Sequence, residues 1–235
     1  MASPSTSAKF NAAGFVAGTL IHTKEGLRPI EQIKVGDWVL SQPEGEGELS
    51  YKQVTRTFVH ESDDLWLLQA NYVIKDVEKI HLAAGVNEIN GEKLYIGQEW
   101  IVTTGGHPYF VKDKGWVKAG YLAWSGYRIK MANGGSASAS HVVKIFQTET
   151  PNLGWAPDEP GAGHVDGPGC TVELGADGLI IVGRKSPPEA SWDFEYPVFI
   201  RTLYGFAVQD NHTYYVGELG LWVHDKAWRT AVELK

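Results

Sequence analysis

Apolar and polar residues alternate along residues 212–225, near the end of the 235-residue chain. Alternation with a period of two is typical of a strand with one buried face. Gly217 and Gly220 interrupt the pattern, and a second apolar run follows them. The stretch therefore predicts two short strands around a turn, and the second strand ends in the pair His224 and Asp225.

The same pattern predicts further strands upstream. Apolar residues run from Phe15 to Ile21, and β-forming side chains dominate from Tyr51 to Val59 and from Leu65 to Gln69. A strand from Glu99 to Thr104 runs into a Gly-Gly turn, and residues from Pro29 to Val35 favour a short helical turn. No long amphipathic helix is evident, so the predicted fold class is all-β.

Three stretches break this pattern because they are rich in Gly, Pro or acidic residues. Residues 43–48 predict a solvated loop, residues 134–138 a flexible segment, and residues 151–169 an irregular loop. Cys170, which follows the third stretch, is the only cysteine. The chain can therefore form no internal disulfide and no cysteine-based zinc site. The cysteine content does not indicate whether the protein belongs to an oxidising or a reducing compartment.

One pattern of residues occurs twice in the chain and divides it into two parts. The layout from Gly26 to Leu40 recurs from Gly115 to Ile129, at an offset of 89 residues. Residues 54–58 are echoed in the same way by residues 142–146. Solenoid repeats have periods of roughly 20 to 50 residues, so this spacing instead predicts two halves related by an approximate twofold axis.

The amino-acid composition further limits the class of protein and its possible partners. Hydrophobic residues make up 43% of the chain, which is enough for one substantial core. The net charge of −7 is spread over interspersed acidic and basic residues, so no basic nucleic-acid footprint is present. No apolar run reaches the roughly 18 residues of a membrane span. We expect a single-domain monomer with no nucleic-acid, membrane or metal partner and no cofactor.

Three short motifs stand far apart in the chain: residues 14–19 (Gly-Phe-Val-Ala-Gly-Thr), residues 104–107 (Thr-Gly-Gly-His) and residues 223–225 (Val-His-Asp). In this order they resemble the Hint family, the self-processing fold of inteins, bacterial intein-like domains and hedgehog autoprocessing domains. In that family a Cys opens the first motif and an Asn closes the last. The resemblance covers residues 14–225 and implies a horseshoe or disc with pseudo-twofold related halves.

Two further stretches, residues 26–37 and residues 210–214, are similar to Hint domains of bacterial secreted and polymorphic toxin proteins. The resemblance implies a part of a larger bacterial protein, whose localisation the sequence does not fix. We expect a flexible leader or N-terminal flank at residues 1–13, the Hint domain at residues 14–225 and a C-terminal flank at residues 226–235. These flanking segments would be the partners of the domain, in cis.

The resemblance also implies a chemistry. The family's Cys attacks the carbonyl before it and forms a thioester, and its last Asn cyclises to release the downstream chain. Thr104 matches the threonine that positions the first scissile peptide, and His107 the histidine that protonates its leaving nitrogen. His224 matches the histidine that protonates the second leaving amine, and His212 the histidine that supports it.

Both reactive positions depart from the family. Gly14 stands where the family has its Cys, so N-terminal thioester chemistry is blocked. Asp225 replaces the Asn and would attack its own carbonyl through oxygen, which leaves at most a slow C-terminal cleavage, favoured by mild acid. Gly205 stands where the family often has an Asp, and Lys226 where splicing members have Cys, Ser or Thr. Shared histidines require Gly14 and Asp225 to lie within about 15 Å.

Three functions stay open at this point. The chain is a Hint autoprocessing domain with a lost nucleophile, a degenerate Hint domain kept as a structural or interaction module, or an unrelated aromatic-rich β domain that binds ligands. The stretch around residues 151–169 lacks the motif of the endonuclease that inteins can carry near this place, and Cys170 matches no motif position. The remaining histidines match none either, and we interpret them as surface or packing residues: His22, His60, His81, His141 and His164.

Overall fold

The described part of the chain forms two antiparallel sheets, one of fourteen strands and one of four, with two single-turn 3₁₀ helices. Within it no helix is long and apolar enough to cross a bilayer. The predicted all-β class is confirmed. His81, His164, residues 226–235 and all but the last of residues 1–13 lie outside the described residues. The computed structural model describes residues 13–45, 47–75, 83–123, 126–158, 169–175, 178–185 and 197–225.

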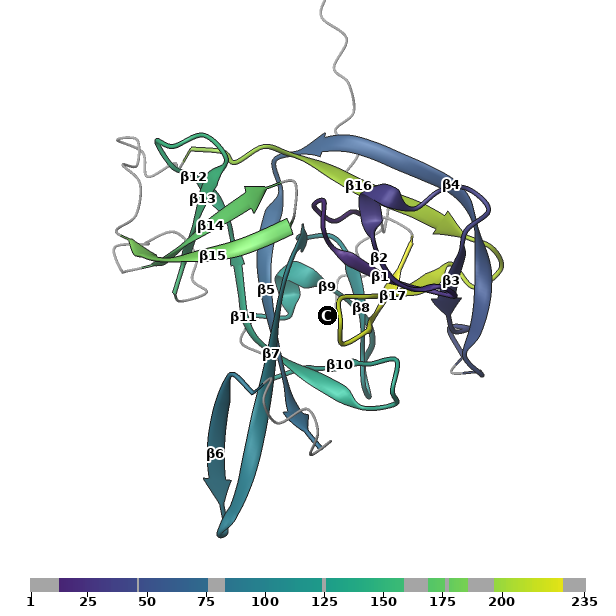
Figure 1. Cartoon of the computed structure of the whole chain (residues 1–235), viewed down its shortest axis with the longest axis horizontal. Helices are drawn as coiled ribbons and strands as arrows, with labels where there is room; N and C mark the ends of the chain where they lie inside the picture. Colours follow the sequence, from purple (N-terminus) through teal and green to yellow (C-terminus); the bar gives the residue numbers. More distant parts are fainter. Residues whose placement is uncertain are drawn as a thin grey trace, which may run out of the picture.

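The larger sheet follows the order β16-β4-β3-β1-β17-β18-β8-β10-β11-β5-β7-β6, with β2 paired to β1 and β9 paired to β8. Figure 1 shows the long strands β4 and β16 running side by side and the β6–β7 hairpin projecting from the body. The strands are β1 Leu20–Thr23, β2 Gly26–Pro29, β3 Trp38–Ser41, β4 Ser50–Ser62, β5 Leu65–Ile74, β6 Gly85–Ile89, β7 Glu92–Thr104, β8 Pro108–Val111, β9 Gly115–Lys118, β10 Arg128–Lys130, β11 Ser136–Lys144, β16 Arg201–Val208, β17 Thr213–Val216 and β18 Leu221–His224.

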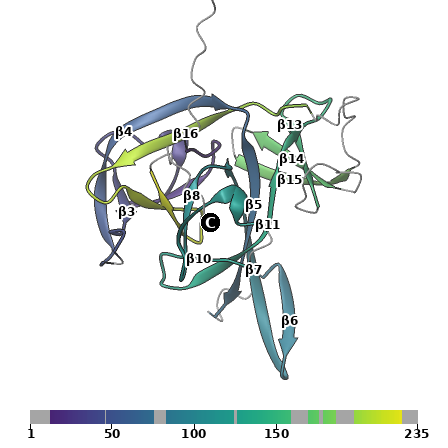
Figure 2. The same ribbon diagram turned by 180° about the vertical axis from the view of Figure 1, so that it is seen from behind.

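The smaller sheet is built from the segment between β11 and β16. Its strands lie in sequence order, each antiparallel to the next. Seen from behind in Figure 2, this sheet lies beside β11. The strands are β12 Phe146–Gln147, β13 Leu153–Pro157, β14 Gly169–Gly175 and β15 Gly178–Lys185.

The N-terminal segment joins two distant strands of the larger sheet. Phe15 forms bridges to Tyr204 on β16 and to Thr103 on β7. The N–H of Phe15 donates to the carbonyl of Tyr204 at 2.9 Å, and the N–H of Tyr204 donates back at 2.8 Å. In the sheet order β16 comes first and β7 second to last. The sheet therefore curls round on itself, and Phe15 closes it.

The sequence echo corresponds to a structural repeat. In the first half β1 pairs with β2, and the 3₁₀ helix η1 and β3 follow; in the second half β8 pairs with β9, and η3 and β10 follow. Helix η1 spans Ile30–Gln32 and η3 spans Ala119–Tyr121, at the offset seen in the sequence. The β17–β18 hairpin lies between β1 and β8. The predicted repeat of elements is confirmed, and the hairpin that carries the third motif joins its two halves.

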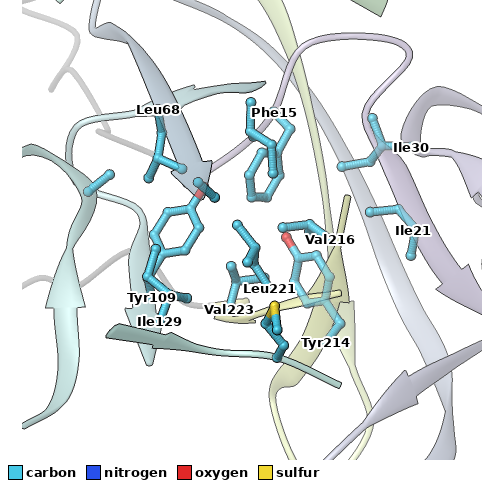
Figure 3. Packing of buried hydrophobic residues seen from close by; sticks show 14 of the residues in the cluster. Phe15, Ile21, Ile30, Leu68, Tyr109, Ile129, Tyr214, Val216, Leu221 and Val223 are labelled. Atoms are coloured by element: carbon cyan, nitrogen blue, oxygen red, sulfur yellow. The ribbon is translucent and has the colours of Figure 1, made fainter. Parts of the chain in front are cut away.

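Apolar side chains from the whole length of the chain meet inside the curled sheet. Figure 3 shows Phe15, Tyr109 and Tyr214 around Leu221 and Val223, and all five are buried. Burying one such side chain contributes about 1.5 to 3 kcal/mol. The β17–β18 hairpin is therefore fixed by its apolar residues, and the polar pair at its end is placed by that packing.

One predicted strand is shorter than its apolar pattern. The sequence predicts a continuous strand from Phe15 to Ile21, but β1 begins at Leu20. Gly18 has a φ of 80°, which glycine adopts without strain, and its N–H donates to the carboxylate of Glu31 at 2.8 Å. This turn breaks the strand and lets Phe15 bridge β7 and β16 instead.

Two predicted loops contain strands. Residues 134–138 read as a flexible segment, yet β11 begins at Ser136. Residues 151–169 read as an irregular loop, yet they contain β13 and the start of β14. A Cβ at Gly169 would overlap the ring of Trp155, so glycine is required there for close strand pairing. Composition alone does not distinguish this use of glycine from its use in loops.

Candidate functional site

The peptide bond between Ala13 and Gly14 lies against β16. A Cβ at Gly205 would lie 3.1 Å from the carbonyl oxygen of Ala13. On the other side, Thr103 Oγ1 donates to the carbonyl of Gly14 at 3.3 Å. The bridges of Phe15 to β7 and β16 follow directly. The chain directly after the bond that the motif marks as scissile is therefore held by both strands that residue 15 joins, and the Ala13 carbonyl lies close to Gly205.

Gly14 leaves little space for a side chain. A Cβ added to it would lie 3.1 Å from the carbonyl oxygen of Tyr204, 3.2 Å from Leu203 Cβ and 3.3 Å from His60 Cε1. These distances are shorter than ordinary van der Waals contact, so the neighbours would have to move by a few tenths of an ångström. The position that matches the family's nucleophile is present, closely packed, and without a side chain.

His107 lies in the turn that follows β7. Its N–H donates to the carbonyl of Thr104 at 3.0 Å, and the N–H of Gly105 donates to the carboxylate of Asp64 at 3.0 Å. The imidazole is fully buried against Phe15, with ring centroids 4.3 Å apart. Within the described part of the chain, neither ring nitrogen has a hydrogen-bond partner.

The environment of His107 disfavours a positive charge. Burial lowers its pKa to about 3, and nearby His224 acts in the same direction. His107 is therefore neutral at pH 7 and must accept a proton before it can protonate a leaving nitrogen.

Thr103 and Thr104 have different surroundings. Thr103 is the threonine that contacts Gly14, whereas the hydroxyl of Thr104 is buried without a partner in the described structure. Successive side chains of a strand point to opposite faces, so the hydroxyls of Thr103 and Thr104 lie on different faces of β7. The role of Thr104 in positioning the scissile peptide stays a prediction.

At the other end, Asp225 is held by four groups. Its N–H donates to the carbonyl of His212 at 2.8 Å. Its Oδ2 accepts from the N–H of Val208 at 2.7 Å and lies 3.2 Å from His212 Nδ1, while Oδ1 lies 3.6 Å from His224 Nδ1. Burial raises the pKa of Asp225, and the Val208 N–H and the two histidines act against that shift.

His224 pairs with a carboxylate from a distant loop. Its Nε2 lies 2.8 Å from Oε1 of Glu44, and its side chain is only 5% exposed. The ring packs edge-on against Trp116, with centroids 5.0 Å apart, and lies parallel to that of His212 at 6.3 Å. The stretch around Glu44 reads as a solvated loop in the sequence, and no spacing there signals a partner for a histidine.

A single strand holds both ends of the site. Residue 14 lies against Leu203 and Tyr204 of β16, and Asp225 accepts a hydrogen bond from Val208 of the same strand. The four residue steps from Tyr204 to Val208 span about 13 Å of strand. The two expected reaction positions are therefore anchored to neighbouring parts of β16.

Other candidate groups lie elsewhere. Cys170 is on β14 of the smaller sheet, opposite Ala156 and Arg184. His22 lies 2.9 Å from the carbonyl of Gly217, in the β17–β18 turn. Within the described ranges no group of three or more His, Cys, Asp or Glu residues could hold a metal ion.

Comparison with known proteins gives one family match and several similar folds. Residues 20–85 match the pretoxin Hint domain family. No curated protein matches the chain. The solution structure of the bacterial intein-like domain from Clostridium thermocellum is 25% identical, over 90% of this chain and 97% of that one, with a TM-score of 0.48. The DnaB intein from Synechocystis sp. PCC 6803 is 10% identical, over 92% and 99%, with a TM-score of 0.43.

The family match and the sequence motifs concern different parts of the chain. The match begins with β1 and extends beyond β5, whereas the second and third motifs lie downstream of it. The all-β antiparallel architecture places residue 14, His107 and the β17–β18 hairpin around one core. The match to the pretoxin Hint domain family over residues 20–85 supports the resemblance to Hint domains that the motifs indicate.

Proposed function

We propose that this Hint domain belongs to the self-processing kind, that Gly14 blocks its N-terminal reaction, and that Asp225 leaves at most a slow C-terminal cleavage. The observation that supports this best is β16, which contacts residue 14 through Tyr204 and Asp225 through Val208, four residues further along the strand. A scaffold without chemistry has no need to gather two remote junctions on one strand. The substrates are then the chain's own flanks, in cis.

The N-terminal block follows from the missing side chain. Thioester formation requires sulfur one bond beyond Cβ of residue 14, to attack the carbonyl carbon of Ala13. The groups closest to that Cβ position are a backbone carbonyl, Leu203 and His60, and none of them is an acyl nucleophile of the family's kind. The amide between Ala13 and Gly14 therefore stays intact.

A nucleophile and a proton donor for the C-terminal reaction are both present. The Asp225 carboxyl attacks its own backbone carbonyl, the new C–O bond closes a five-membered anhydride, and the bond to Lys226 breaks. His224 gives its proton to the departing amine. Water then opens the anhydride and regenerates the carboxyl group. Glu44, 2.8 Å from His224, would stabilise the protonated imidazole that this step requires.

Restoring each junction separately tests the proposal. In Gly14→Cys, thiol treatment should release residues 1–13, and in Asp225→Asn, incubation at pH 7 should release residues 226–235. Gly14→Ala is the matched control, since it adds the same Cβ without sulfur. Intact mass spectrometry follows both products. If both restored variants fold and neither loses a segment over days, self-processing is excluded.

The degenerate-module alternative is supported by a specific observation. Gly14 and Asp225 stand at the family's two reactive positions, and Gly205 stands where the family often has an Asp. A domain kept only as a structural module would lose these residues together. Failure of the restored variants, with folding preserved, would favour that function.

A further inference from the structure

His60 lies beside the empty nucleophile position. It is on β4, paired with Leu203 of β16. Its Cε1 would lie 3.3 Å from a Cβ at Gly14. Both ring nitrogens are bonded to Cε1, so a sulfur atom one bond beyond that Cβ can reach hydrogen-bond distance of one of them in a rotamer that points toward the ring. The sequence assigned His60 no role, because neighbours across a sheet cannot be seen in its spacing.

The hydrogen-bonding state of His60 is also unusual. Both ring nitrogens are shielded from solvent, and neither has a hydrogen-bond partner in the described structure. Buried polar groups in native proteins are nearly always paired, so an unpaired one calls for an explanation. A side chain able to pair with the ring is missing at one adjacent place, residue 14. The missing side chain at residue 14 accounts for the unpaired imidazole of His60.

We propose that His60 is the base that accepts the proton of a thiol at residue 14. This inference rests on the proposed self-processing function. The thiol gives its proton to His60, the sulfur bonds to the carbonyl carbon of Ala13, and the bond from that carbon to the residue-14 nitrogen breaks. The nitrogen takes a proton and leaves as an amine, so thiol and amide become thioester and amine with no other reactant.

His107 is less suited to this first step. Its pKa is lowered to about 3, so it is a weak base at neutral pH. The charged groups next to His60 along β4 and β16 are Glu61 and Arg201. Glu61 accepts from Thr202 Oγ1 at 2.5 Å, and burial lowers the pKa of Arg201. We therefore assign proton acceptance to His60 and leave donation to the departing amine to His107.

The test uses the full chain with Gly14→Cys and Cys170→Ala, so that one thiol is present, compared with and without His60→Gln. Removing the base should slow thiol-dependent release of residues 1–13 at pH 7 by about 10²-fold or more. The deficit should shrink toward pH 9, where the thiol ionises unaided. Unchanged rates and an unchanged pH profile would overturn the inference.

A second measurement keeps the two proposals distinct. Ultraviolet titration of the introduced thiolate needs no cleavage, and His60→Gln should raise the thiol pKa by about one unit or more. If the Gly14→Cys chain never cleaves but the pKa moves as expected, the proposed function fails and the assignment of His60 stands. If the pKa does not move, the assignment fails. His60→Asn replaces His60→Gln if thermal melting shows that the latter is unfolded.

Discussion

The two ends of the candidate site differ in what they contain. At the N-terminal junction the backbone is held on both sides, but residue 14 has no side chain and two neighbouring histidines have no hydrogen-bond partners within the described residues. At the C-terminal junction the side chain is present, and hydrogen bonds and ion pairs hold it: Asp225 with Val208, His212 and His224, and His224 with Glu44. In the chemistry proposed above, the first end lacks its nucleophile, and the second carries a carboxyl group in place of an amide.

This contrast separates two ways to lose activity. A missing nucleophile cannot be compensated by conditions, because no protonation state or temperature supplies a sulfur atom. A carboxylate in place of an amide can respond to conditions, since its protonation depends on pH. The N-terminal junction should therefore respond only to substitution, and the C-terminal junction to both substitution and acid.

Asp225→Asn should give the largest change at the C-terminal end. An ordinary carboxyl is protonated in only about one molecule in 10³ at pH 7, whereas an amide is always neutral, so release of residues 226–235 should accelerate by about 10²- to 10³-fold. Mass spectrometry of samples taken over days measures the rate. Gly14→Ala should leave it unchanged. Equal rates for Asp225 and Asn would show that protonation does not limit this end.

His224→Ala, made in the Asp225→Asn background, should come next. It removes the group that protonates the leaving amine, and a positioned general acid is typically worth about 10²-fold or more. Glu44→Gln keeps His224 and removes only its carboxylate, so its loss should be smaller. The same mass assay ranks the three proteins. A Glu44→Gln loss as large as that of His224→Ala would contradict a merely supporting role.

Acid should have a smaller effect on the unsubstituted chain. Burial raises the pKa of Asp225, so the carboxyl keeps its proton to higher pH than a free one. Release of residues 226–235 should be at least about tenfold faster at pH 5 than at pH 8. Thiol should release nothing from the N-terminal end at either pH. Thiol-dependent loss of residues 1–13 from this protein would overturn the contrast between the two ends.

The last prediction concerns the stability of the fold and Glu99, which contacts the β17–β18 turn. Its carboxylate accepts from the N–H groups of Glu218 at 2.6 Å and Leu219 at 3.0 Å, and burial raises its pKa to about 7. The folded pKa lies above the unfolded one, so the buried group favours folding in its protonated form; this contribution to stability is fully present below about pH 4.5 and is lost as the pH rises through 7. The loss is at most about 3 kcal/mol.

Thermal melting at pH 5 and pH 8 measures this contribution. Glu99→Gln should reduce the difference between the two melting temperatures, because an amide does not titrate. It should also slow C-terminal release without affecting a Gly14→Cys N-terminal reaction, since the turn belongs to the hairpin that carries His224. A pH difference in melting that Glu99→Gln leaves intact would assign it to other groups.

The sequence predicts the repeated parts of this fold well. Turn glycines and the aromatic strands that follow them recur at the same offset, so the hairpins at Gly26 and Gly115 are visible from local pattern. The smaller sheet is not visible, because its glycines and prolines resemble those of a loop. Gly169 distinguishes itself only through contact with Trp155, which lies on another strand.

The site shows the same division. The motif residues His107, His212 and His224 can be found from sequence because they lie at fixed places in their elements. His60 and Glu44 cannot, since the first reaches residue 14 through the register of β4 with β16 and the second reaches His224 from a loop. Such partners are fixed by pairing between distant segments, which leaves no periodic signal in the chain.

The way the smaller sheet joins the body has a practical consequence. The chain departs at β12 and returns beside it, where Phe146 bridges Val198 and the N–H of Gln147 donates to Pro197 at 2.9 Å. This stem makes the intervening segment a removable cassette, and a short turn across the stem would close a smaller loop at lower entropic cost. The excision would uncover Leu67 and Val102, which now pack with residues of the cassette. A minimal domain would need polar residues at those two positions. A foreign sequence inserted on the intact stem would instead leave β16 and the two junctions that it contacts unchanged.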